Sequence, residues 1–197
     1  MPPICVGERT RSVLIEVRPL GLDGVLEIRP RRLRDDRGFF SETWNEREFR
    51  DAGIDVSFVQ DNHSLSREPG VLRGLHFQAP PFAQSKLIRV SRGSVFDVAV
   101  DIRSGSPTYG QWVSAILSAA EWNQMFVPAG FAHGFLALEP DTEVQYKVSA
   151  PYSREHDRAI RFDDPAIGVE WPIDLAALIL SDKDRAAPLL AEIETGF

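Results

Sequence analysis

The feature that most constrains the fold is a succession of short β-type runs separated by turn residues. The runs expected to form strands are Val25–Arg29, Phe39–Trp44, Val56–Gln60, Val71–Phe77, Lys86–Val90, Val95–Ile102, Gln111–Leu117, Met125–Val127, Phe131–Leu138 and Glu143–Val148. Turn residues such as Ser104-Gly105-Ser106-Pro107 and Pro128-Ala129-Gly130 lie between them. Many short strands at intervals of about 8–12 residues predict an antiparallel, all-β sandwich or barrel.

Helix signals are few. Asn45 is a suitable N-cap with Glu48 three residues later, and the helix that it begins should end before Gly53. The residues from Ser181 onward suggest further short helical pieces. The chain has 197 residues, with no linker, low-complexity tract or internal repeat. This length is enough to bury one hydrophobic core, so we expect a single domain, 1–197.

The charge distribution argues against nucleic acid as a partner. The formal net charge is −7, and the basic cluster within residues 29–34 is followed at once by Asp35 and Asp36. Proteins that bind a phosphate backbone normally present a basic face. We interpret these arginines as the solvated face of a strand.

Three features predict a cytoplasmic protein without a membrane segment. Cys5 is the single cysteine, which excludes an internal disulfide and fits a reducing compartment. No apolar run approaches the roughly 20 residues of a membrane span. The first residues also lack the charged and apolar segments of a signal peptide.

The histidines do not form a pattern typical of a metal site. His63, His76, His133 and His156 are all isolated, with no His-x-His pair and no cysteine cluster. Distant residues can still converge in space, so the pattern weakens a metal site without excluding one. A metal-dependent barrel therefore stays open at this point.

His76 lies in a predicted strand, where side chains alternate between the two faces. Arg73 and Phe77 are expected to face one way, and His76, Gln78 and Gly74 the other. One interpretation is a core histidine bonded to a neighbour. The alternative is a ligand-binding face, because glycine lets a ligand approach the backbone.

Other polar residues have both structural and functional interpretations. Asp184 in Ser181-Asp182-Lys183-Asp184 fits a helix cap, and His133, between aromatic residues, fits a barrel filler. Tyr146 should face opposite to Gln145 and Lys147. The polar residues 60–63 interrupt an expected buried strand, and burial of such groups is costly unless they are bonded. A polar barrel interior around a ligand is the natural explanation for them.

Taken together, an ordered set of motifs resembles the dTDP-4-dehydrorhamnose 3,5-epimerase family. The motifs are RGFFSE (37–42), FVQDNHS (58–64), GVLRGLHFQ (70–78), KLIRV (86–90), DVAVDIR (97–103), PAGFAHGF (128–135) and SDKD (181–184). The resemblance runs from about Val25 to about Pro188. It implies a cupin-type jelly roll, a homodimer, and catalysis without a metal or other cofactor. Residues 1–24 form an N-terminal extension of unknown role.

The resemblance implies an acid–base reaction on a dTDP-linked 4-keto-6-deoxyhexose, whose C3 and C5 protons are acidified by the C4 ketone. His76 matches the family's base, with Asp184 orienting it, and Tyr146 matches the acid on the opposite face. Lys86 matches a cation near the C4 oxygen, where negative charge develops. An imidazole that titrates near the operating pH suits proton abstraction.

The resemblance also implies a substrate-binding set. Arg73 and Arg37 match diphosphate contacts, which suit a guanidinium fork, and the segment Arg37–Glu42 reaches the partner's site in the family. The other matching residues are Phe40, Glu42, Gln60, Asn62, His133, Tyr152 and Lys183. Pro151 departs from the pattern because many members have a second tyrosine there, which puts the placement of Tyr152 in question.

The sequence leaves several functions open. A 3-epimerase that inverts C3 alone would use the same base and acid, and a keto-sugar isomerase on a related jelly roll would move the carbonyl. A non-catalytic sugar-nucleotide binding module would keep the arginines but need not keep His76 bonded to Asp184. The pathway, cell-surface L-rhamnose or a deoxysugar of a secondary metabolite, is likewise open.

Overall fold

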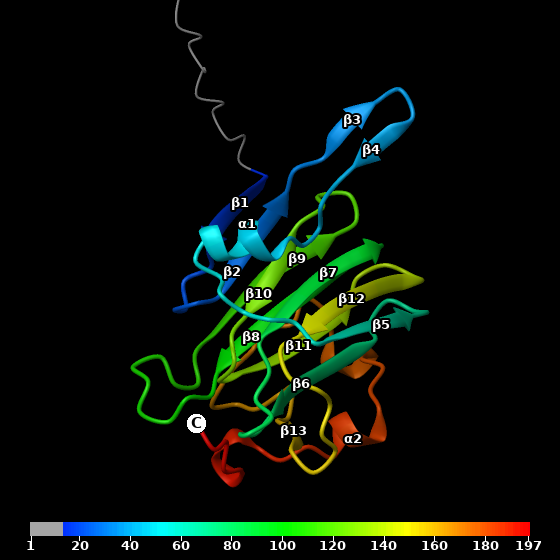
Figure 1. Cartoon of the computed structure of the whole chain (residues 1–197). Helices are drawn as coiled ribbons and strands as arrows, with labels where there is room; N and C mark the ends of the chain where they lie inside the picture. The colour runs from blue at the N-terminus through cyan, green and yellow to red at the C-terminus, as the bar shows by residue number, and fades with distance from the viewer. Residues whose placement is uncertain (1–13) are drawn as a thin grey trace, which may run out of the picture.

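The computed structural model describes residues 14–197, and two antiparallel sheets that face one another dominate it (Figure 1). The six-stranded sheet has the spatial order β1 (Ile15–Pro19), β2 (Leu26–Pro30), β10 (Gln124–Val127), β7 (Lys86–Arg92), β12 (Thr142–Val148), β5 (Gln60–Ser66). The five-stranded sheet has the order β13 (Asp157–Ala159), β6 (Leu72–Gln78), β11 (Phe131–Ala137), β8 (Ser94–Asp101), β9 (Trp112–Ser118). β3 (Leu33–Asp35) and β4 (Gly38–Phe40) form a separate hairpin. The predicted all-β class is confirmed.

Side-chain alternation builds the core between the sheets. Ile88 and Val90 of β7 pack there with Phe131 and Phe135 of β11, and all four are buried. Leu87, the residue before Ile88, packs instead in the cluster on the outer face of its sheet. Each such side chain stabilises the fold by about 1.5–3 kcal/mol through burial. This period of two also decides which polar side chains point between the sheets.

Further layers cover the outer faces of both sheets. Phe49 of α1 (Glu46–Asp51) is buried in one cluster with Leu87, over the six-stranded sheet. On the five-stranded sheet, Val98 shares a buried cluster with Trp171 from the C-terminal part of the chain. The strands therefore bury apolar residues on both faces.

The predicted helix signals are confirmed. The Asn45 side chain accepts hydrogen bonds from the backbone N–H groups of Arg47 and Glu48, and α1 ends at Asp51, before Gly53. Ser181 caps α2 (Asp182–Arg185) by accepting from the backbone N–H of Asp184. Two 3₁₀ turns, Leu175–Ala177 and Leu190–Glu192, are also present in the C-terminal part.

Two predicted strands are misplaced. The strand expected over Phe39–Trp44 ends at Phe40, and the one expected over Val56–Gln60 begins only at Gln60. Trp44 and its apolar neighbours pack against the outer face of the six-stranded sheet without pairing. Burial against a sheet gives irregular chain the same apolar signal as a strand, and this misled the prediction. β1, β3 and β13 were not predicted.

Only part of the predicted N-terminal extension, residues 1–24, lies within the described residues. Cys5 and the other residues up to position 13 lie outside the described residues. β1 pairs antiparallel with β2, from Ile15 opposite Pro30 to Pro19 opposite Leu26. Part of the extension therefore forms the edge strand of the six-stranded sheet.

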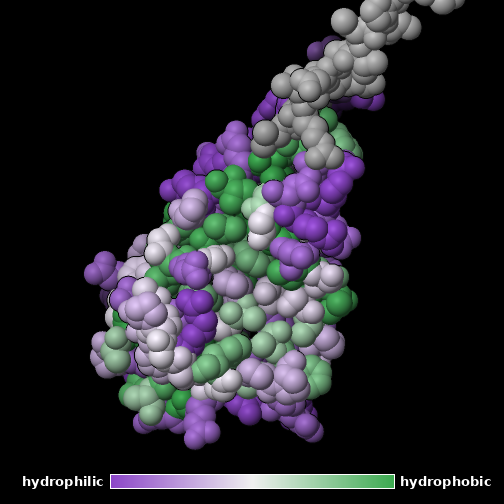
Figure 2. Space-filling model, turned by 60° about the vertical axis from the view of Figure 1, so that its left-hand side comes forward, coloured by the Kyte–Doolittle hydropathy of each residue, from purple (hydrophilic) through white to green (hydrophobic). Residues whose placement is uncertain are grey.

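The β3–β4 hairpin projects from one end of the sandwich (Figure 1). Phe39 stacks edge-on against Trp122 with ring centroids 4.8 Å apart, while Phe40 is 64% exposed and Leu33 is 47% exposed. Elsewhere, Figure 2 shows hydrophilic and hydrophobic residues interspersed over the visible face. Among residues 14–197, no helix is long and apolar enough to cross a membrane.

Candidate active site

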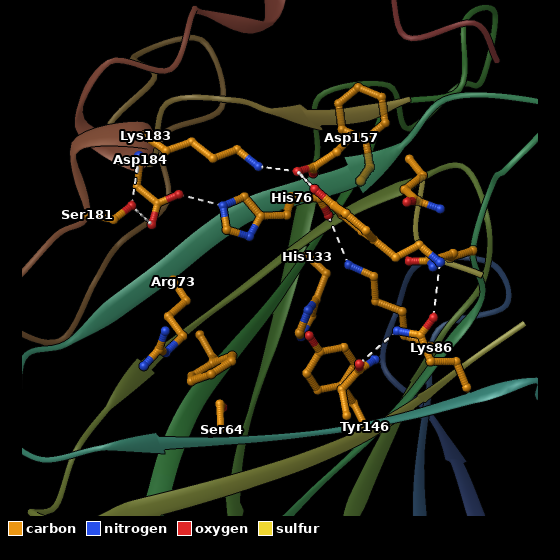
Figure 3. A pocket seen from close by; sticks show the side chains of 17 residues that line it. Ser64, Arg73, His76, Lys86, His133, Tyr146, Asp157, Ser181, Lys183 and Asp184 are labelled. Carbon is orange, nitrogen blue, oxygen red and sulfur yellow. Dashed lines mark hydrogen bonds and ion pairs between the residues drawn. The ribbon is translucent and has the colours of Figure 1, made fainter. Parts of the chain in front are cut away.

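A cavity of about 570 Å³ lies at one end of the sandwich, between the two sheets (Figure 3). Strands of both sheets line it, and residues of the C-terminal part, including α2, complete its wall. Its lining includes ten of the residues predicted for the site: Gln60, Asn62, Arg73, His76, Lys86, His133, Tyr146, Tyr152, Lys183 and Asp184. The fold therefore gathers most of the predicted residues at one place.

His76 and Asp184 form a direct pair in this pocket. Nε2 of His76 lies 2.5 Å from Oδ1 of Asp184, and Oδ2 of the same carboxylate accepts a hydrogen bond from the Ser181 hydroxyl at 2.8 Å. Burial would raise the pKa of Asp184, but the hydrogen bond and charge of His76, with Ser181 and Lys183, outweigh it and lower the pKa. The segment Ser181–Asp184 thus both caps α2 and pairs with His76.

The pairing sets the tautomer of His76. A carboxylate can only accept hydrogen bonds, so Nε2 of the neutral imidazole carries the hydrogen. Nδ1 is then the unprotonated nitrogen on a ring that lines the cavity, with its side chain 32% exposed. His76 is therefore set up to take a proton through Nδ1.

Lys86 is a buried cation in the same cavity. Its Nζ donates to the backbone carbonyl of His76 at 3.1 Å, and the residue is only 7% exposed. Burial lowers the pKa of Lys86 to about 8, although Asp97 and Asp157 oppose the shift. An ammonium group has three hydrogens, so two remain available to an oxygen atom in the pocket.

Tyr146 comes from the sheet opposite His76. It lies on β12 of the six-stranded sheet, whereas His76 lies on β6 of the five-stranded sheet. As predicted, Tyr146 faces inward, while Lys147 faces outward and pairs with Asp61 at 2.7 Å. Burial raises the pKa of Tyr146, so the phenol keeps its proton through the neutral range.

The prediction that Arg73 faces away from His76, made from strict alternation along β6, was wrong. Both side chains line the same cavity. The register of β6 against β11 shifts between the pairs His133–His76 and Phe135–Arg73, which adds one residue to the strand. Gly74 lies in this bulge with φ of +136°, and a Cβ there would stand 2.4 Å from Cα of Gly134. Close packing of two backbones, rather than access for a ligand, therefore requires this glycine.

A family model described as dTDP-4-dehydrorhamnose 3,5-epimerase matches residues 19–192. A relative with the same name from Sinorhizobium fredii is 56% identical over 178 residues, which are 90% of this chain and 91% of the relative. The chain belongs to the dTDP-4-dehydrorhamnose 3,5-epimerase family.

Solved structures of epimerases agree with this membership. The Legionella pneumophila 3,5-epimerase in complex with dTDP-4-keto-L-rhamnose superposes with a TM-score of 0.87 at 43% identity, covering 91% of this chain and 95% of that one. A 3′-monoepimerase from Streptomyces bikiniensis, in complex with dTDP-quinovose, gives 0.81 at 35% identity, with coverage of 88% and 87%. The predicted cupin-type jelly roll is confirmed.

Three predicted binding residues of this epimerase-family chain lie away from the cavity of their own chain. Arg37 is on the tip of the β3–β4 hairpin and pairs with Asp35 at 2.6 Å, and Phe40 projects from the same hairpin. Glu42 follows the hairpin and accepts a hydrogen bond from Asn45 at 2.8 Å. The fold of one chain therefore does not place these side chains against a ligand bound to His76.

Sequence reasoning missed several residues of the epimerase-family pocket. Alternation placed Gln78 on the face of His76 without predicting it as a binding residue, and Ser64, two positions after Asn62, could have been found in the same way. Asp157 pairs with Lys183 at 2.5 Å and accepts a hydrogen bond from the Tyr152 hydroxyl at 3.2 Å. It had no sequence signal, because it comes from a short strand that was not predicted.

Pro151, the predicted departure from the family pattern, lies beside the pocket. Its carbonyl accepts from Nε2 of Gln78 at 3.1 Å, and the next residue, Tyr152, donates its N–H to Gln60 at 3.0 Å. The Tyr152 side chain is 58% exposed at the rim. The proline thus leaves the wall bonded on both sides through backbone groups.

Within the part of the chain that the structure describes, no three His, Cys, Asp or Glu side chains are grouped closely enough to hold a metal ion. The four histidines of this epimerase-family chain have separate partners. His63 pairs with Glu143 at 3.1 Å outside the cavity, and His156 bonds to Ser153 at 2.8 Å.

Proposed function

We propose that the protein epimerises C3 and C5 of dTDP-4-keto-6-deoxy-D-glucose to give dTDP-4-keto-L-rhamnose, a step of deoxysugar biosynthesis. The observation that carries the proposal is the hydrogen-bonded pair of His76 and Asp184 on one wall of the cavity, with Tyr146 on the opposing wall. Inversion of a carbon needs a base and an acid on opposite faces of the sugar ring. Membership of the epimerase family supplies the substrate class.

His76 acts as the base in this proposal. Nδ1 takes the proton from the carbon next to the C4 ketone, and the electron pair of the broken C–H bond moves into an enolate. The imidazolium that forms stays bonded to Asp184 through Nε2. The carboxylate favours the charged ring and holds its orientation, which suits general base catalysis.

Lys86 stabilises the enolate. Negative charge develops on the C4 oxygen, and a preorganised buried ammonium group interacts strongly with such a charge because water is excluded. Its hydrogen bond to the carbonyl of His76 ties the cation to the strand that carries the base. The base His76 and the cation Lys86 that stabilises the enolate are thus held next to each other.

Tyr146 returns the proton from the other face. Its buried phenol is protonated at neutral pH, so it can give a proton to the enolate carbon on the face away from His76. The same pair can act at C3 and then at C5 when the ring presents each carbon in turn. Arg73 and Lys183 at the cavity provide cations for the diphosphate.

Inversion at C3 alone is a second candidate, because a 3′-monoepimerase is 35% identical to this chain. The higher identity of 56% to a 3,5-epimerase favours the double reaction. A non-catalytic binding module has less support, since such a protein would not need His76 and Asp184 to lie 2.5 Å apart.

The test is NMR of the purified protein with dTDP-4-keto-6-deoxyglucose in D₂O after EDTA treatment. We expect deuterium at both C3 and C5, together with the rhamno-configured product. Deuterium at C3 alone would instead establish the mono-epimerase. No exchange at either carbon would refute the proposed reaction.

We further propose that the active form is a homodimer in which the β3–β4 hairpin completes the partner's cavity. The support is the position of the hairpin, which projects from the body with Phe40 64% exposed (Figure 1). The Arg37 side chain at its tip pairs with Asp35 but is 90% exposed, and in the dimer it approaches a phosphate group of a ligand held by the other subunit. Phe39 of the hairpin packs on Trp122 of its own chain, but Leu33 and Phe40 stay largely exposed.

Mixed dimers test this arrangement. Arg37→Ala should lower kcat/KM by about 10-fold or more, because a charge-assisted hydrogen bond to the diphosphate is lost. Co-expressed His76→Ala and Arg37→Ala chains, purified as heterodimers through two affinity tags, should recover about half the activity of the wild-type dimer. One of the two sites then has both an intact base and an intact hairpin.

The matched control for this experiment is Arg34→Ala, which removes another exposed arginine of the same hairpin and should leave activity unchanged. Heterodimers no more active than the two parental variants would refute the shared site. A monomeric elution volume with full activity would refute the dimer itself.

A further inference from the structure

Asp97 is a buried carboxylate that the proposed reaction does not yet use. It lies on β8 with 0% exposure, and its neighbour by alternation, Ala99, faces the core between the sheets. Oδ1 lies 2.8 Å from Nε2 of His133. Oδ2 is buried and accepts no hydrogen bond from any protein group among residues 14–197. A carboxylate buried in this way is costly unless its charge is balanced nearby.

His133 connects Asp97 to the cavity. It lies on β11, directly opposite His76 of β6 and Ala99 of β8, and it lines the pocket. Burial lowers the pKa of His133, although Asp97 opposes the shift, so the ring is neutral. Because the carboxylate accepts, Nε2 carries the hydrogen and Nδ1 is left as an acceptor for a hydroxyl group.

Lys86 lines the same cavity as His133 and is the buried cation whose charge interacts with that of Asp97. Asp97 on β8 and Asp157 on β13 favour its protonated form, whereas burial and Lys183 on α2 oppose it. Asp157 is already paired with Lys183 at 2.5 Å, so its negative charge is balanced by that partner. His76, His133 and Tyr146, from β6, β11 and β12, line the same cavity.

We propose that Asp97 is a positioning residue of the active site, whose buried carboxylate fixes the orientation and tautomer of His133 and balances the positive charge of Lys86. The inference rests on the proposed function. Asp97 does not touch the substrate in this account. It acts through His133 and Lys86, which do touch the substrate. This role gives a reason for a buried carboxylate with an unbonded oxygen among the apolar residues of β8.

Direct titration of Lys86 tests the inference without any activity measurement. The chain has three lysines, Lys86, Lys147 and Lys183, so protein labelled with ¹³C at lysine Cε gives three signals, and a Lys86→Arg variant assigns one of them. Lys86 should titrate near pH 8 in the wild-type protein. In Asp97→Asn, which keeps the shape and the acceptor for His133, the midpoint should fall by about one pH unit.

The rate profile should follow the titration. The alkaline limb of kcat for Asp97→Asn should move to lower pH by the same amount, while the wild-type and variant rates converge at lower pH. Asp97→Leu removes the acceptor as well, and ¹⁵N-histidine spectra should then show that His133 no longer holds the Nε2–H tautomer. This second variant tests the contact even if the pH profile is complex.

Asp101→Asn is the matched control. Asp101 is also fully buried on β8, but it is bonded to Arg103 at 2.7 Å, away from the cavity. Its loss should lower thermal stability and leave the Lys86 midpoint unchanged. An Asp97→Asn midpoint equal to that of the wild type would overturn the inference. Absence of epimerase activity in the wild-type protein would refute the proposed function but leave the titration result to stand by itself.

Discussion

Replacement of His76 with alanine is expected to lower kcat by at least about 1000-fold, because the variant lacks the base that removes the proton from C3 and C5. Nδ1 of His76 is the unprotonated nitrogen of the pair with Asp184. The diphosphate and nucleotide contacts are made elsewhere, so the affinity for dTDP should change little. Coupled turnover assays and calorimetric titration with dTDP measure the two effects separately.

Substitution of a second histidine provides the control. His63→Ala removes a side chain that is 52% exposed and pairs with Glu143 outside the cavity, so kcat should stay within about twofold of the wild type. Deuterium exchange into the substrate should also vanish in His76→Ala and persist in His63→Ala. Exchange at the wild-type rate in His76→Ala would assign the base to another residue.

The fold was predictable where strand signals came from alternation within the sandwich. Ile88 and Val90 face the core while Leu87 faces outward, and the pattern predicted the start of β7 at Lys86, although the strand runs on to Arg92. The prediction failed where apolar residues pack without pairing, as at Trp44. β13 was missed because three residues carry too little periodic signal to be distinguished from a loop.

The site was predictable for a different reason. Most of the predicted pocket residues lie on strands whose inward faces meet in the cavity, so the family's motifs carry over with the fold. The position of Arg73 could not be derived from alternation, because the bulge opposite Gly134 becomes visible only when β6 and β11 are paired. The role of Asp97 could not be predicted for a related reason. It lies in an apolar strand, and its partner His133 is 36 positions away in the sequence.

Tyr146→Phe should separate proton removal from inversion. The variant keeps His76, Asp184 and Lys86, so the enolate still forms and the base still returns a proton to the same face. Product formation should fall by about 100-fold to 10,000-fold, because the opposite face has lost its acid. Solvent deuterium should nevertheless enter C3 of the unconverted substrate, which NMR in D₂O detects directly.

Tyr109→Phe is the matched control, because Tyr109 is 43% exposed and lies outside the cavity, and both rates should stay at wild-type values. Burial raises the pKa of Tyr146, so the phenol is protonated at neutral pH and its loss removes a proton donor from this wall of the cavity. If exchange and product formation fall together in Tyr146→Phe, the phenol contributes to enolate formation and the acid lies elsewhere. If exchange alone survives, the two walls of the cavity carry the two halves of the reaction, His76 from the five-stranded sheet and Tyr146 from the six-stranded sheet.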